Sequence, residues 1–141
     1  NSVSISKDQK IIIAGGDDRM THIFSWSEAL GTYELAQSIK EKSNINSVSL
    51  SKDKCTIANG LNSGNLTIHK YSPQTKSFEM FQELEGHTDK IMSVSMSSKQ
   101  GEMIVTGSFD GSLRIWRSKE SLIKNTLAST QENLTFFSAP K

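Results

Sequence analysis

The 141-residue sequence predicts an all-β protein built from three consecutive four-stranded antiparallel sheets. Three observations support this prediction. A segment of the chain occurs three times, apolar and small polar residues alternate with period two inside each copy, and residues typical of tight turns separate the alternating runs. Together they indicate a repeat architecture in which each copy is one sheet.

The repeat is clearest at the start of each copy. The segment NSVSISKD at 1–8 recurs as NSVSLSKD at 46–53 and as MSVSMS at 92–97, with shifts of 45 and 46 residues. Later segments align too: IIIAG at 11–15 with TIANG at 56–60 and MIVTG at 103–107. Self-similarity at a period of this length is typical of structural units that stack on one another.

Four alternating runs in each copy predict four strands. The expected ranges are 2–6, 11–15, 20–26 and 33–39, then 45–50, 55–60, 65–71 and 78–84, then 91–97, 102–107, 112–117 and 121–128. The segment 27–40 also has scattered apolar positions that would suit a helix, but Gly31-Thr32-Tyr33 interrupts them. An outer strand is therefore the better interpretation.

The best-preserved copy is GHTDKIMSVSMSSKQGEMIVTGSFDGSLRIW at 86–116, which opens on Gly-His and closes on a tryptophan. It resembles the WD-repeat (WD40-type) family of β-propellers. The resemblance implies three blades at 1–43, 44–90 and 91–130, with 131–141 beginning a fourth, inside a larger, seven-bladed ring. We expect a piece of a longer propeller; the alternative is that a partner chain or a second copy completes the ring.

In the third copy the resemblance implies a buried relay of hydrogen bonds from Asp110 to His87, to Thr106 or Ser108, and to Trp116. Such a relay satisfies polar groups that would otherwise be buried without partners. Serine, histidine and aspartate also compose a hydrolase triad. A nucleophile, however, needs an exposed oxygen and an oxyanion hole, so we favour the structural interpretation and predict no catalytic residue.

The other two copies depart from this pattern. The first keeps Asp18 but has Ala14 and Phe24 at the threonine and tryptophan positions, while the second has Glu41 at the histidine position and His69 at the tryptophan position. We therefore expect only one complete relay, and we expect the second copy to depend more on apolar packing.

Composition restricts the functional classes. The formal net charge is +1 and basic and acidic residues are interspersed, which disfavours nucleic acid as the main ligand. No apolar run approaches the length of a membrane span. The single cysteine, Cys55, excludes an internal disulfide and is expected to be a buried thiol in a reducing compartment. We expect an intracellular, cytoplasmic protein, with cytoskeletal or nuclear association as alternatives.

No metal site or cofactor is predicted. The three histidines, His22, His69 and His87, fall in different copies at non-equivalent positions, without the short spacing of metal ligands. Asp17-Asp18 follows a Gly-Gly pair, but the lysine and the helix of a phosphate-binding loop are missing, so a hairpin turn is the better account.

The resemblance implies a non-catalytic scaffold that binds other proteins within a multiprotein complex. The candidate contact residues flank the relay or occupy equivalent turns: Phe109, Asp89, Lys90, Asp17 and Asn62. Phe109 is the main anchor candidate, with packing against a neighbouring blade as the alternative. Two other functions stay open: the propeller domain of a larger enzyme, and a purely structural subunit of a large assembly.

Overall fold

The structure, a computed structural model, describes residues 1–96, 102–119 and 122–125. These residues contain strands and turns but no helix, so the predicted all-β class is confirmed. The strands are β1 (Ser2–Ile5), β2 (Ile11–Gly15), β3 (Met20–Ser27), β4 (Thr32–Lys40), β5 (Ile45–Leu50), β6 (Thr56–Leu61), β7 (Leu66–Ser72), β8 (Ser77–Leu84), β9 (Ile91–Met96), β10 (Met103–Ser108), β11 (Leu113–Lys119) and β12 (Leu122–Asn125). The strand predicted to begin a fourth copy, within 131–141, lies outside the described residues.

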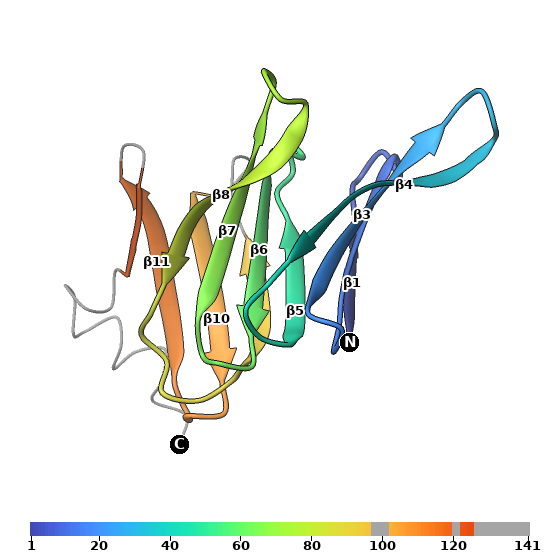
Figure 1. The fold of residues 1–141 in the computed structure, drawn as a ribbon. Coiled ribbons are helices and arrows are strands. Elements are labelled where there is room, and N and C mark those ends of the chain that lie inside the picture. The colour runs from blue at the N-terminus through green and yellow to red at the C-terminus, as the bar shows by residue number, and fades with distance from the viewer. Residues whose placement is uncertain (97–101, 120–121, 126–141) are drawn as a thin grey trace.

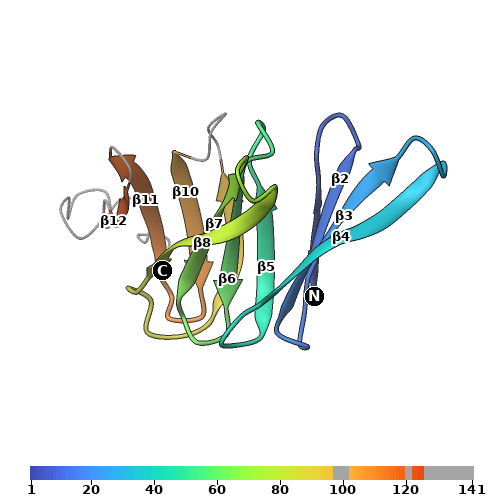
Figure 2. The same ribbon diagram turned by 45° about the horizontal axis from the view of Figure 1, so that its top comes forward.

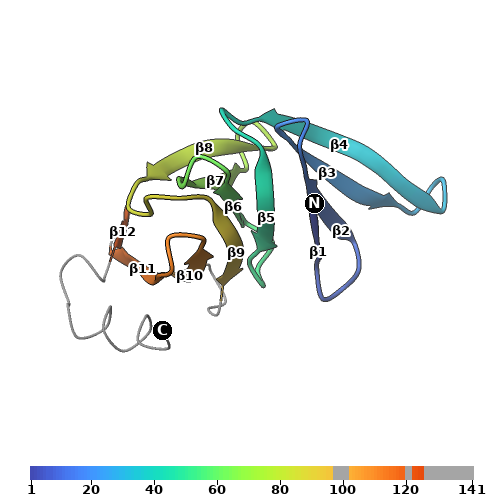
Figure 3. The same cartoon turned by 90° about the horizontal axis from the view of Figure 1, so that it is seen from below.

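The strands form three antiparallel four-stranded sheets, consistent with propeller blades: sheet 1 (β1–β4), sheet 2 (β5–β8) and sheet 3 (β9–β12). Within each sheet the spatial order follows the chain order, and the sheets follow one another in a curved row (Figures 1 and 3). The first strands β1, β5 and β9 are neighbours along this row. The helix alternative for 27–40 is wrong, because β4 pairs with β3 along its length.

The repeated Ser-Lys-Asp segment builds the same hairpin turn in sheets 1 and 2. Ser6 Oγ donates to Asp8 Oδ1 at 2.6 Å, and Ser51 Oγ donates to Asp53 Oδ1 at the same distance. Each serine hydroxyl also accepts a main-chain N–H from the start of the next strand. A short polar side chain that binds its own backbone fixes a tight turn, which explains why this segment recurs.

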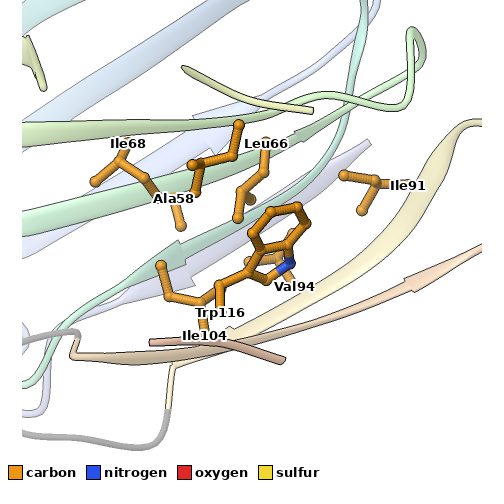
Figure 4. Packing of buried hydrophobic residues seen from close by; sticks show 8 residues of the cluster. Ala58, Leu66, Ile68, Ile91, Val94, Ile104 and Trp116 are labelled. Carbon is orange, nitrogen blue, oxygen red and sulfur yellow. The ribbon is translucent and has the colours of Figure 1, made fainter. Parts of the chain in front are cut away.

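Apolar side chains fill the two spaces between neighbouring sheets. The cluster between sheets 2 and 3 has Trp116 as its largest member and is shown in Figure 4. Its buried residues are Ala58, Leu66, Ile68, Leu84, Ile91, Val94, Ile104 and Trp116. The cluster between sheets 1 and 2 consists of Ile13, Ile23, Ile45, Val48, Ile57, Leu61 and Phe78. The alternation in the sequence thus places one face of each strand in a core that two sheets share.

Repeated hydrogen bonds join one sheet to the next. Asn1 Nδ2 donates to the Ile45 carbonyl and Asn46 Nδ2 donates to the Ile91 carbonyl, both at 3.1 Å. The serine after each asparagine also bonds to the next sheet, but as an acceptor. Ser2 Oγ accepts a hydrogen bond from the N–H of Val48 at 3.2 Å, and Ser47 Oγ accepts one from the N–H of Val94 at 3.0 Å. The repeated Asn-Ser pair therefore links a sheet to its successor.

Close packing between the sheets also depends on a glycine at or near the end of the second strands of sheets 1 and 2. A Cβ atom on Gly15 would lie 2.5 Å from Ile45 Cγ2, and one on Gly60 would lie 2.5 Å from Ile91 Cγ2. At the equivalent position of sheet 3, no described residue lies within 4 Å of a Cβ built on Gly107. At the other end of the row, Val3 of sheet 1 is 73% exposed, whereas the equivalent Val48 and Val94 are buried.

Cys55 is exposed, so the prediction of a buried thiol is wrong. The strand β6 begins one residue later, at Thr56, which leaves the cysteine in the preceding turn. Across the described ranges of the chain there is also no helix that could span a membrane.

Candidate functional site

The connection between sheets 2 and 3 brings together four polar side chains from different elements. His87 lies in the loop between β8 and β9, Thr106 on β10, Asp110 in the β10–β11 turn and Trp116 on β11. The turn requires a left-handed residue, which Gly111 supplies with φ of 82°. The hairpin therefore places the aspartate beside the incoming loop, with the histidine between it and the core.

Hydrogen bonds join these side chains into one continuous chain. Trp116 Nε1 donates to Thr106 Oγ1 at 2.9 Å, and Thr106 Oγ1 lies 2.7 Å from His87 Nε2. His87 Nδ1 lies 2.8 Å from Asp110 Oδ2. The main-chain N–H of Thr88 also donates to Asp110 Oδ2, at 3.0 Å. The aspartate thus ties the β10–β11 turn to the loop that enters sheet 3.

The partners fix the direction of each bond. An ionised carboxylate only accepts, so the His87 proton lies on Nδ1 and Nε2 accepts the Thr106 hydroxyl. Burial lowers the pKa of His87, against the opposing effect of Asp110. Partial burial alone would raise the pKa of Asp110, but hydrogen bonds from Ser112 and His87 outweigh it and hold this pKa well below its usual range. The pair is therefore a neutral imidazole and a carboxylate near neutral pH.

We expect the free energy of unfolding to fall when the pH is lowered from about 7.5 to about 5.5. The folded-state pKa of His87 lies below the ordinary value of 6.5, so in the interval between them the unfolded chain binds a proton that the folded chain does not. Stability is then fully present above about pH 6.5 and decreases below it. The charged groups that act on the ring are Asp110 and Arg114.

Urea denaturation at the two pH values measures this effect. His87→Gln is the matched control, because its amide oxygen can accept the Thr106 hydroxyl but does not titrate. The variant should lose less stability over the interval than the parent protein. Equal losses in the two proteins would show that His87 is not the responsible group.

The threonine hydroxyl is unsuited to nucleophilic chemistry. Thr106 is fully buried. Its hydroxyl oxygen accepts a hydrogen bond from Trp116 Nε1, and its hydroxyl group donates a hydrogen bond to His87 Nε2. Ser108, the other candidate for this position, lies outside the chain of bonds, since its hydroxyl donates to the main-chain carbonyls of Asp89 and Lys90 at 2.9 Å. The geometry thus selects Thr106 for the relay, and Ser108 positions the loop before β9.

Residues 78–117 match the family model described as WD domain, G-beta repeat. This segment is similar to a WD40 repeat. The matched segment, called the WD40 repeat below, covers β8 of sheet 2 together with β9, β10 and most of β11 of sheet 3, so the loop that carries His87 lies inside it. The four-stranded sheets 1 and 2, which precede sheet 3 along the chain, are consistent with further WD repeats. A search of curated proteins finds no match to the chain.

Sheet 2 packs through many buried apolar side chains, as predicted, and it also contains a second polar network. Glu41 is buried and its Oε1 accepts Asn59 Nδ2 at 2.9 Å and Thr67 Oγ1 at 3.0 Å. The same oxygen lies 2.6 Å from His69 Nε2. Glu41, Asn59 and His69 occupy the positions that His87, Thr106 and Trp116 have in the WD40 repeat. One carboxylate therefore replaces a histidine as the buried centre of the sheet.

Sheet 1 has a more exposed pair. His22 Nε2 lies 2.9 Å from Asp18 Oδ2, and His22 Nδ1 lies 2.8 Å from Ser38 Oγ. Each of the three histidines therefore contacts a different carboxylate. Within the described residues, no three His, Cys, Asp or Glu side chains come together to hold a metal ion.

Three of the five candidate contact residues lie together beside the relay. Phe109 is 63% exposed at the β10–β11 turn, and Lys90 Nζ lies 4.5 Å from the centre of its ring. The main chain fixes this arrangement, since the Phe109 N–H donates to the Lys90 carbonyl at 3.0 Å. Asp89 is exposed on the same loop and its Oδ1 accepts the Lys90 N–H. We call Phe109, Lys90 and Asp89 the turn surface.

The other two candidates lie in equivalent turns of sheets 1 and 2. Asp17 is exposed, and its carboxylate accepts Asn1 Nδ2 at 2.7 Å and Asn44 Nδ2 at 3.3 Å. Asn62 is exposed and lies 3.5 Å from Asn46. Because the β2–β3, β6–β7 and β10–β11 turns all lie at the same end of the sheets, these residues face the same side as the turn surface (Figure 3).

Proposed function

We propose that this chain is a non-catalytic protein-binding scaffold whose turn surface contacts a partner within a multiprotein complex. WD40 domains in general mediate protein–protein interactions and are generally non-catalytic. The observation that carries the proposal is the exposed Phe109 ring covered on one side by the Lys90 ammonium. An aromatic side chain on a rigid turn is a typical anchor at protein interfaces.

The relay supports the proposal because it makes the turn rigid. Asp110, the residue after Phe109, accepts bonds from the loop, the histidine and Ser112. Phe109 is therefore held in place before a partner arrives, which lowers the ordering cost of binding. Phe109 is mostly exposed among the described residues, and packing against a further sheet beyond sheet 3 stays the alternative.

A larger ring belongs to the same proposal. Val3 is exposed at a position where the other sheets bury a valine, and the space over Gly107 is open among the described residues where the other sheets receive an isoleucine. Both outer faces of the row are thus shaped to receive a further sheet. We place the protein inside the cell, an assignment supported by its exposed, unpaired thiol at Cys55.

Pull-down from an extract, with the parent protein and with variants, tests the proposed surface. Phe109→Ala should reduce recovery of a specific partner about tenfold or more, as removal of an interface anchor does. Leu30→Ala is the matched control, because Leu30 is 65% exposed on the distant β3–β4 turn. Equal recovery with folded Phe109→Ala and Leu30→Ala proteins would exclude the turn surface as the contact.

A further inference from the structure

We propose that the groove between sheets 1 and 2 binds a short extended peptide in which acidic residues flank large apolar ones. The groove has a volume of about 410 Å³, within the range of ligand sites. It is formed by the β3–β4 and β7–β8 hairpins and by the turn before β6, at the opposite end of the sheets from the turn surface (Figure 1). A protein with both sites would bind two partners at once.

The walls of the groove are apolar. Sheet 1 contributes Ile11, Ile23 and Ala36, and sheet 2 contributes Tyr71 and Phe78. The two aromatic rings meet edge to face with centroids 5.4 Å apart, and Tyr71 remains 41% exposed. Burying an exposed aromatic surface under a leucine or phenylalanine side chain is favourable, so the groove suits a large apolar side chain.

The groove also runs beside two edge strands. β4 is the outermost strand of sheet 1 and β8 that of sheet 2, and both lie in front of their sheets in Figure 2. Between them, the side-chain amide of Gln37 donates to the Phe78 carbonyl and accepts the Phe78 N–H, both at 2.8 Å. This is the pair of bonds that a peptide unit makes with an edge strand. A peptide can pair with this edge of β8 by displacing the Gln37 amide from Phe78, a mode of binding that a lipid chain cannot use.

Lysines outnumber carboxylates in the lining of the groove and of the hollow that shares Lys54 with it. Four lysines line the groove or the hollow that adjoins it: Lys7, Lys52, Lys54 and Lys76. Two carboxylates accompany them, and both are engaged within the protein. Asp8 lies 2.6 Å from Lys54 Nζ, and Asp53 accepts bonds from Ser51 and from the Cys55 N–H. Lysines in excess beside an apolar groove complement a ligand with carboxylates beside its apolar side chains.

Cys55 lies in the lining of the groove and reports on its occupancy. It is the single cysteine of the sequence, so a thiol reagent labels one position. Partial burial, reinforced by Asp53, raises the pKa of the thiol. The thiol is therefore a slow nucleophile at neutral pH, and its labelling rate depends on access to the groove.

The experiment uses the full chain and a blocked, fluorescent hexapeptide, Glu-Asp-Leu-Phe-Asp-Glu. We expect saturable binding by fluorescence anisotropy and slower reaction of Cys55 with N-ethylmaleimide when the peptide is present. Replacing the acidic residues of the peptide by lysine, or its Leu-Phe pair by Ser-Ser, should weaken binding about tenfold. If either altered peptide binds as tightly as the original, or if the original leaves the labelling rate unchanged, the proposal is wrong.

Protein variants locate the site. Lys76→Glu should weaken binding of the acidic peptide about tenfold, and Lys52→Glu is a second variant should the first fail to fold. Phe109→Ala, at the far end of the sheets, should bind the peptide like the parent protein, so failure of this proposal and failure of the turn surface are distinguishable. Dodecanoate is tested in the same labelling experiment. If dodecanoate slows the labelling of Cys55 and the peptide does not, the groove binds a small amphipathic anion and the peptide assignment is wrong.

Discussion

Thr106→Val should lower the free energy of unfolding by about 2–5 kcal/mol, because it leaves two buried groups without partners. The substitution preserves the shape of the side chain, so it creates no cavity. It removes the oxygen that accepts Trp116 Nε1–H and the proton that His87 Nε2 accepts. Each buried unsatisfied group costs on the order of 1–3 kcal/mol. Urea denaturation of the variant and the parent at the same pH measures the loss.

Thr21→Val is the matched control for this change. Thr21 is as deeply buried as Thr106, but its hydroxyl has no hydrogen-bond partner among the described residues. The same replacement should therefore leave stability unchanged or raise it by about 1 kcal/mol. Opposite effects at the two sites would show that the hydrogen bonds, and not burial alone, make Thr106 important. A small effect at Thr106 would contradict the assigned role of the relay.

The second large effect is expected at the junction between sheets 2 and 3. Gly60→Ala places a methyl group 2.5 Å from Ile91 Cγ2 and 2.7 Å from Val94 Cγ2. Real carbon atoms do not approach so closely, and the backbones on both sides are held by strand pairing. Overpacking of this kind costs about 1–3 kcal/mol. Thermal or urea unfolding should show the loss.

Gly16→Ala controls for the general effect of replacing glycine. The added carbon would meet Asn1 N at 3.6 Å and Asp18 Oδ1 at 3.8 Å, which are ordinary contact distances. Its stability should stay within about 0.5 kcal/mol of the parent. In addition, Ile91→Ala should partly rescue Gly60→Ala, because it removes the nearer of the two clashing atoms, Ile91 Cγ2, and leaves Val94 Cγ2. If the double variant shows only the sum of the two single losses, the steric explanation is incorrect.

Much of the fold could be predicted because the sequence repeats. Alternation in NSVSISKD and its copies predicted the strands, and the position of the turn residues predicted the hairpins. The role of the Asn-Ser pair could not be predicted, since its bonds reach residues about one repeat further along the chain, such as Ile45 and Val48. Cys55 was misplaced by a shift of one residue, because the alternation alone does not determine where a strand begins.

The network around Glu41 was missed for a different reason. Glu41 and His69 differ from the residues at the same positions of the third copy, and this difference was interpreted as loss of the relay. Together with Asn59, however, they align with the three relay positions of that copy. Three polar residues at aligned buried positions were a signal that could have revealed it. Glu41 accepts three bonds at this position, so the position requires a buried polar centre and not one residue type. The satisfaction is incomplete, because Asn59 Oδ1 and His69 Nδ1 have no hydrogen-bond partner among the described residues.

The central claim is that the relay is structural and that the turn surface beside it binds a partner. The most direct measurement is the amount of partner recovered per folded molecule for Phe109→Ala and for Thr106→Val, at a temperature where both are folded. We expect Phe109→Ala to lose the partner while keeping the stability of the parent, and Thr106→Val to lose stability while keeping the partner. Full recovery with Phe109→Ala, together with loss of the partner from folded Thr106→Val, would contradict the claim.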